Sequence, residues 1–164
     1  MRVLVVGRGV GGLCMASGLS RLPFINEIKV IGDDASSYLH GYTGLWSPAL
    51  QALKHLMPQR EFDILHSNIE FINNSGFFSL NGEMLAKPST KPNLGFIKNS
   101  DLCNHIKLCT NNNVKIIHEN ETVTNVNCEN NEVTCSSGKK YQADLIIGAD
   151  GKLRHSIFIH FCFH

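Results

Sequence analysis

The chain has 164 residues, of which 43% are hydrophobic and 18% are charged, a composition typical of one globular domain rather than of a disordered or collagen-like chain. Fifteen Lys and Arg against 14 Asp and Glu give a formal charge of +1. This balance argues against nucleic acid binding, which requires a strongly basic surface.

Neither end of the sequence predicts a membrane segment. No basic stretch precedes an apolar one at the N-terminus, so a secretory signal is not expected. Residues 157–164 are apolar but too few to cross a bilayer, which takes about 20 residues. We therefore expect a cytoplasmic chain whose six cysteines are free thiols, because that compartment is reducing. None forms a CxxC pair, so neither a zinc ribbon nor a redox pair is expected.

The first elements in chain order predict a βαβ unit. The apolar run 3–6 is typical of a strand buried on both faces of a parallel sheet. Apolar and small residues then recur at helical spacing over 10–22, with Pro23 as a stop signal. A second strand is expected at 27–31, and the unit has the expected size of about 30 residues.

The middle of the chain predicts a loop at 41–44, a short helix at 48–56 ended by Pro58, and short antiparallel strands within an inserted segment at about 69–97. Asn81-Gly82 is the clearest hairpin turn in that segment. A helix is expected from Asp101 to about Cys109, with Ser100 as its N-cap.

The last part predicts a strand at 114–117 and then a small antiparallel meander at 122–127, 132–135 and 140–142. A further buried strand is expected at 144–147. Together these elements predict an α/β, Rossmann-like domain that binds FAD or NAD(P) and carries a β-meander.

A glycine pattern at the first strand-to-helix junction predicts a dinucleotide site. Gly7, Gly9 and Gly12 fit G-x-G-x-x-G: Gly7 for a tight turn, Gly9 for close approach of a pyrophosphate, and Gly12 for close packing of helix on strand. The helix N-terminus would offer N–H groups and a positive dipole to the phosphates. The alternative is a glycine-rich turn that only shapes the fold.

An acidic residue about 20 positions after this motif should bind a ribose hydroxyl. Gly32-Asp33-Asp34 follows the second strand, and we favour Asp33 over Asp34 for this role. The alternative is that both are only turn residues, which Asp favours.

Residues 143–151, Ala-Asp-Leu-Ile-Ile-Gly-Ala-Asp-Gly, provide a second motif. The segment resembles the strand and G-A-D-G turn of the FAD-dependent aromatic-ring hydroxylases, the flavoprotein monooxygenases of the p-hydroxybenzoate hydroxylase type. The resemblance implies a glutathione-reductase-like FAD domain over residues 1–151, with Asp150 and Gly151 near the pyrophosphate. Lys98 stands where the family commonly has a cofactor-contacting arginine before a helix.

The resemblance also implies the activity: hydroxylation of an organic substrate with O2, using FAD and NADPH or NADH. It covers less than half of such an enzyme, and residues 152–164 depart from the family as an atypical tail. We therefore expect a truncated form without the substrate domain, in which exposed sheet edges could promote self-association.

No catalytic acid, base or metal site is predicted. His160, Cys162 and His164 would share one face of a strand, but three ligands without a fourth make a poor closed metal site. Two alternatives to the monooxygenase remain: a non-catalytic protein that binds a nucleotide or another chain, and an NAD(P)-dependent oxidoreductase.

Overall fold

The structure, a computed structural model, describes residues 1–33, 41–72, 76–86, 94–110 and 114–151. Its centre is a parallel four-stranded sheet in the order β12-β1-β2-β8. The predicted strands are confirmed, with bounds of Arg2–Val6 for β1, Glu27–Ile31 for β2, Lys115–Glu119 for β8 and Leu145–Gly148 for β12.

The strand β1 is buried on both faces, as its continuous apolar sequence predicts. Val3 and Val5 pack toward α1 (Val10–Leu19), whereas Leu4 and Val6 pack on the opposite side of the sheet. The start of the strand is tied to β12, because the carboxylate of Asp144 accepts the backbone N–H of Arg2 at 2.7 Å.

The helix α1 ends at Leu19, three residues before its predicted end at Leu22. The N–H of Ser20 still bonds to Ala16, but the next two N–H groups bond to carbonyls three residues back, which tightens the chain into a turn. Both sides of the helix are covered: Ala16 faces the parallel sheet and Leu13 faces the other helices. A helix covered in this way can be apolar or small on all sides.

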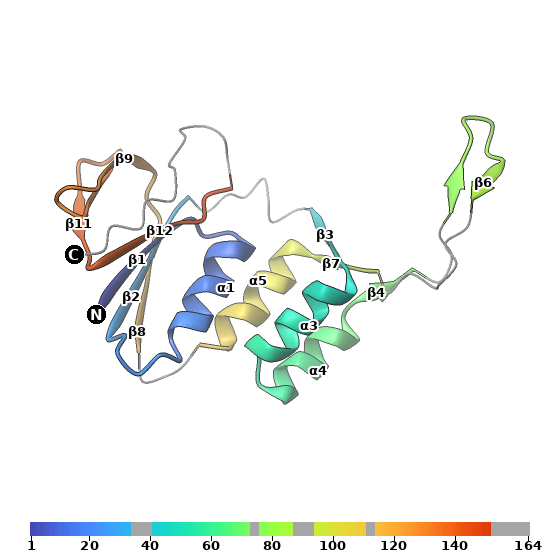
Figure 1. Cartoon of the computed structure of the whole chain (residues 1–164), viewed down its shortest axis with the longest axis horizontal. Coiled ribbons are helices and arrows are strands. Elements are labelled where there is room, and N and C mark those ends of the chain that lie inside the picture. The colour runs from blue at the N-terminus through green and yellow to red at the C-terminus, as the bar shows by residue number, and fades with distance from the viewer. Residues whose placement is uncertain (34–40, 73–75, 87–93, 111–113, 152–164) are drawn as a thin grey trace.

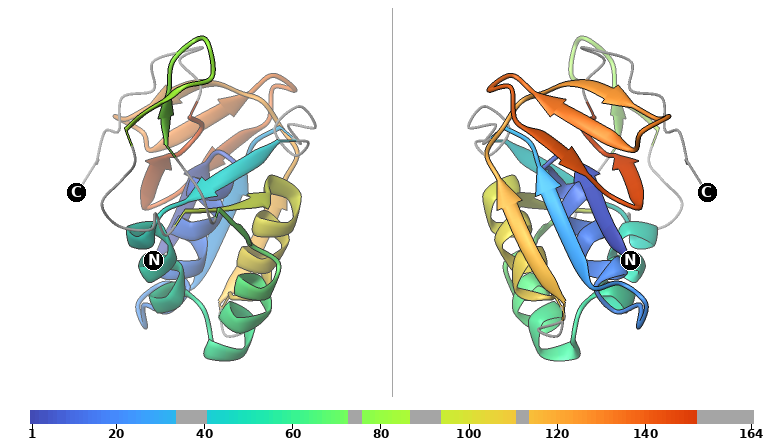
Figure 2. Two further views of the ribbon diagram at one scale, coloured as in Figure 1. Left: turned by 90° about the vertical axis from the view of Figure 1, so that its right-hand side faces the viewer. Right: turned by 90° about the vertical axis from the view of Figure 1, so that its left-hand side faces the viewer.

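The predicted meander is confirmed and covers the other face of the parallel sheet (Figure 2). Its strands β9 (Val123–Asn127), β10 (Glu132–Cys135) and β11 (Lys140–Gln142) form a three-stranded antiparallel sheet. The meander contributes buried Val133 and Cys135 to a core shared with Leu4 and Val6. The architecture is therefore three layers: meander, parallel sheet and helices.

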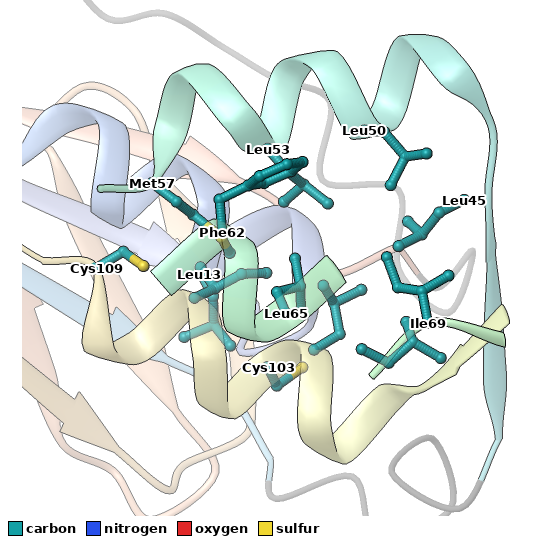
Figure 3. Close-up of a cluster of buried hydrophobic side chains, with 13 residues drawn as sticks. Leu13, Leu45, Leu50, Leu53, Met57, Phe62, Leu65, Ile69, Cys103 and Cys109 are labelled. Atoms are coloured by element: carbon teal, nitrogen blue, oxygen red, sulfur yellow. The ribbon is translucent and has the colours of Figure 1, made fainter. Parts of the chain in front are cut away.

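A second group of elements packs beyond α1 (Figure 1). It contains α3 (Ser47–Leu56), α4 (Gln59–Ser67), α5 (Asn99–Leu108) and a small sheet of β3 (Tyr42–Leu45), β7 (Gly95–Lys98) and β4 (Glu70–Phe71). Figure 3 shows their apolar side chains, together with Leu13 of α1, pointing into one shared interior.

Two predictions for this group are wrong, and one helix was not predicted. Residues 41–44 were expected as a loop, but Tyr42–Leu45 is a strand because it pairs with the distant β7. The helix α4 was not predicted, because Pro58 was interpreted only as a stop, whereas it is also the N-cap of α4. Ser100 is not an N-cap: Lys98 takes that position without a side-chain cap, so α5 begins two residues before the predicted Asp101.

The hairpin of β5 (Phe77–Phe78) and β6 (Met84–Ala86) stands apart from both groups (Figure 1). Its turn contains Asn81-Gly82, as predicted, with Gly82 at φ +83°. Strands β4 and β7, at the ends of the predicted insert, belong instead to the sheet with β3. The tail, residues 152–164, and with it His160, Cys162 and His164, lies outside the described residues, as does Asp34.

Candidate functional site

The carboxyl ends of β1, β2 and β12 meet at one edge of the parallel sheet. The N–H of Gly7 donates to the carbonyl of Ile31 at 2.7 Å, and the N–H of Ala149 donates to the carbonyl of Val6 at 2.6 Å. These bonds hold the loops after the three strands beside one another. We call the predicted residues gathered here the strand-end cluster: Gly7, Gly9, Gly12, Asp33, Asp150 and Gly151.

Positions 7 and 12 require glycine, because backbone atoms approach them closely. Gly7 has φ +123°, and a Cβ at this position would lie 2.3 Å from the carbonyl oxygen of Ala149. A Cβ on Gly12 would lie 1.9 Å from the carbonyl oxygen of Gly7. Any side chain at either position would therefore push the turn away from β12 or the helix away from the turn.

Gly9 and Gly11 face open space instead. A Cβ at either position would have nothing within 4 Å, and both residues are exposed. Gly9 is the N-cap of α1, with no side-chain cap, and the first turn of this helix contains no acidic residue. The positive end of α1 is therefore open to an anion, and the missing side chains leave room for a phosphate to approach the backbone.

Asp33 is exposed at the end of β2 and bonds to the start of the meander. Its Oδ1 accepts a hydrogen bond from the hydroxyl of Thr122, 89 residues along the chain. Between β2 and Asp33 lies Gly32, whose N–H donates to the carbonyl of Glu119 at 3.1 Å. A Cβ on Gly32 would lie 2.9 Å from the backbone nitrogen of Arg8. The loop after β1 therefore packs directly on Gly32.

Asp150 and Gly151 continue β12 beyond its last pairing with β1. Both are exposed, and Gly151 has φ +61°, a conformation that favours glycine. The backbone nitrogen of Asp150 would lie 2.6 Å from a Cβ on Gly7, so this turn and the glycine loop are in direct contact.

Positive charge near the cluster comes from Arg8, whose Nη1 donates to the carbonyl of Gly32 at 3.4 Å. Burial, followed by the charges of Lys107 and Arg8, lowers the pKa of His118 near the end of β8. This lowered pKa disfavours the charged form of the His118 ring.

Lys98 lies elsewhere. It is exposed at the end of β7, opposite Tyr42 of β3, in the sheet of the second group. Its position directly before α5 agrees with the pattern that suggested it, but it belongs to a different sheet from the strand-end cluster.

Two residues of the site were missed from the sequence, Gly32 and Thr122. The Gly-Asp-Asp run after the second strand could have indicated Gly32, because a glycine at a strand end commonly marks a close backbone approach. Nothing in the sequence around Thr122 indicates a partner 89 residues away.

The cluster is suited to binding rather than to bond-making chemistry. It offers backbone N–H groups, a carboxylate and a guanidinium, which recognise phosphates and hydroxyls. Within the described ranges, no three His, Cys, Asp or Glu residues are placed to hold a metal ion. Nor does any helix in those ranges have the length and apolar content to span a membrane.

The sequence matches no protein-family model and no curated protein. Solved structures, however, resemble it closely in fold. The tetrameric form of 2-methyl-3-hydroxypyridine-5-carboxylic acid oxygenase matches with a TM-score of 0.71 and 21% identity, over 92% of this chain and 39% of that one.

Two further solved structures share this fold. A candidate FAD-containing monooxygenase from Photorhabdus luminescens subsp. laumondii TTO1 has a TM-score of 0.67 and 26% identity, over 92% of this chain and 39% of its own. Tetracycline destructase Tet(51) has a TM-score of 0.62 and 20% identity, over 92% and 38%. The chain therefore has an α/β fold shared with part of these proteins and spans about two fifths of their length.

Proposed function

We propose that this chain is the FAD-binding part of an NAD(P)H-dependent flavoprotein monooxygenase. The observation that carries the proposal is the strand-end cluster, in which a glycine loop, an open helix N-terminus, Asp33 and the Asp150 turn meet at one edge of a parallel sheet. This edge is where α/β folds bind dinucleotides. The fold shared with FAD-containing monooxygenases favours FAD over other dinucleotides.

Each residue has a role that its surroundings support. The pyrophosphate would lie over Gly9, where the first-turn N–H groups of α1 point and no side chain intervenes. Asp33 would accept a hydroxyl of the adenosine ribose. Asp150 and Gly151 would line the other side of the pyrophosphate, because their turn touches Gly7.

We assign residues 1–151 to a glutathione-reductase-like, Rossmann-type domain of the p-hydroxybenzoate hydroxylase kind, followed by an atypical tail at 152–164. Lys98 would contact the cofactor from the second group of elements, although lysine lacks the fork of donors that arginine has. Flavin, when bound, supplies the redox chemistry, and NADPH or NADH is the expected reductant. The residues of this chain bind and orient it.

The test is a flavin titration of the purified 164-residue chain, followed by removal of excess FAD and an absorbance spectrum of the eluted protein. We expect flavin bands that co-elute with folded protein and are reduced in Gly9→Ala. The matched control is Gly18→Ala, on the same helix, where a Cβ would make only an ordinary 3.5 Å contact with Leu56. A folded chain that retains no FAD contradicts the proposal, and binding of a nicotinamide nucleotide alone would indicate a dehydrogenase-type site.

A second candidate is a nucleotide-binding protein without turnover. It is favoured by the composition of the strand-end cluster, because every group in it suits phosphate or ribose recognition and none is a paired acid and base. Binding of FAD and of ADP-ribose with equal affinity, with no oxidation of NADPH or NADH by the FAD-bound chain, would support this candidate.

We also propose that the chain self-associates through its β5–β6 hairpin. Five large apolar side chains are exposed there: Phe77 (70%), Phe78 (56%), Leu80 (107%), Met84 (54%) and Leu85 (68%). Each partner of a stable dimer buries roughly 800 Å², and these five side chains would supply the apolar part of such a surface. A two-stranded hairpin is at best marginally stable alone in water, so pairing with a second hairpin would stabilise both.

A further inference from the structure

The meander contacts the strand-end cluster through Thr122. This residue directly precedes β9, and its hydroxyl donates to Oδ1 of Asp33. The hydroxyl-to-carboxylate bond is charge-assisted and is therefore stronger than a bond between neutral groups. It connects the predicted ribose-binding carboxylate to a separate layer of the fold.

Asp33 needs such a partner because of its location. It is exposed, and it lies two residues after the last residue of β2, so its own strand does not fix its side chain. Immobilising a side chain on binding costs conformational entropy, which weakens binding. A partner that fixes the carboxylate in the free protein removes part of this cost.

Thr122 is itself held firmly by the rest of the meander. Its carbonyl accepts the N–H of Ser136 at 2.8 Å. The preceding residue, Glu121, forms an ion pair with Lys139 at 2.7 Å, and the Glu121 side chain is only 11% exposed. Both anchors come from the turn between β10 and β11, so the donor to Asp33 has a fixed position.

A carboxylate can accept about four hydrogen bonds, so the bond from Thr122 leaves capacity for a ribose hydroxyl. We propose that Thr122 is a positioning residue for adenosine recognition: it holds the Asp33 carboxylate in the orientation that binds the ribose of a dinucleotide. The inference rests on the proposed FAD-binding function. It also gives the meander a role in binding, through a residue that does not touch the cofactor.

The experiment measures dissociation constants for FAD, ADP-ribose and FMN in the full chain and in Thr122→Val. FMN lacks the adenosine half and serves as an internal control. We expect binding of FAD and ADP-ribose to weaken by about threefold to tenfold, in the range of couplings between residues in contact, with FMN binding unchanged. Thr122→Ser, which keeps the hydroxyl, should restore affinity.

Thr124→Val is the matched control, because the Thr124 hydroxyl donates to the backbone carbonyl of Thr134 at 3.1 Å instead of to Asp33. It should bind all three ligands as the unmodified chain does. A double-mutant cycle then tests the pathway: in an Asp33→Asn background, Thr122→Val should have no further effect on FAD affinity.

Three outcomes would overturn the inference. Unchanged or tighter FAD binding by Thr122→Val would mean that Thr122 does not orient Asp33 or that it competes with the ribose. Equal weakening for FMN, or additive effects in the cycle, would indicate a general structural role. If the unmodified chain binds neither FAD nor ADP-ribose, the proposed function itself fails, and this result is distinct from the other two.

Discussion

Alanine substitutions at Gly12, Gly9 and Gly18 separate the steric role of a glycine from its role in binding. Gly12→Ala places a methyl group 1.9 Å from the carbonyl oxygen of Gly7, so backbone must move. Overpacking of this kind costs about 1–3 kcal/mol. For a chain of this size we expect Tm to fall by about 2–12 °C.

Gly9→Ala should behave differently, because a Cβ there meets nothing within 4 Å. Replacing glycine by alanine at an N-cap costs about 0.5–1 kcal/mol, whereas a methyl group over the helix end would weaken pyrophosphate binding about tenfold or more. Gly18→Ala should leave FAD affinity unchanged and raise stability by up to about 1 kcal/mol.

One assay measures both effects. With FAD at 100 times the dissociation constant of the unmodified chain, ligand binding adds about 2.7 kcal/mol to the free energy of unfolding. A tenfold weaker Gly9→Ala would gain only about 1.4 kcal/mol under the same conditions. Thermal unfolding followed by circular dichroism, with and without FAD, gives both numbers. A Gly9→Ala variant with the full gain, or a Gly12→Ala variant as stable as the unmodified chain, would refute this account of the loop.

Three other predictions concern stability, reactivity and association. The hydrogen bond from the backbone N–H of Arg2 lowers the pKa of Asp144 below its ordinary 3.8. The ionised Asp144 therefore stabilises the folded chain above pH 3.8, and this contribution is lost as the pH falls through the lower pKa of the folded state. In an acid denaturation series, the difference in free energy of unfolding between the unmodified chain and Asp144→Asn should therefore shrink toward zero. Burial, followed by the charges of two neighbouring cysteines, raises the pKa of Cys14 to about 11. Iodoacetamide reacts with the thiolate, so at pH 8 it should alkylate Cys14 far more slowly than the partly exposed Cys128. Equal alkylation rates measured by mass spectrometry would contradict this prediction. If the chain self-associates through the β5–β6 hairpin, its sedimentation coefficient should rise with concentration, and Phe78→Ser should reduce that rise. Leu108→Ser removes a side chain on α5 that is 70% exposed and should leave the rise unchanged. Equal effects of the two substitutions would show that the contact does not depend on the hairpin.

Local patterns in the sequence predict much of this fold, but they do not predict strands that form by pairing with distant segments. The bounds of β2, β10 and β11 were predicted to the residue, because each is a short run between clear turn residues. By contrast, the sequence of β3 contains Gly44 and resembles a loop, and the strand forms only by pairing with β7, 50 or more residues later. Propensity does not carry information about such distant partners.

The candidate site divides in the same way. The need for glycine at position 12 follows from spacing, since its close contact is with Gly7 in the same βαβ unit. The contact of Gly7 is with Ala149, which follows the distant strand β12, so spacing alone does not predict it. The Thr122 bond depends on how the meander packs across the parallel sheet, and no local pattern encodes that packing. Pro58 shows a different limitation, because proline both ends one helix and begins the next.

The central position of β1 has a consequence for how the chain becomes functional during synthesis. Val3 pairs with Ile28 on one side but with Leu145 on the other, so nearly the whole described chain must leave the ribosome before that second edge is closed. Contacts this distant in sequence form slowly, and the open edge is exposed to other chains in the meantime. Because the Gly7 turn rests against Ala149, the proposed nucleotide site is completed only late in folding. If the chain binds FAD as proposed, free FAD would favour completed molecules over unfinished ones.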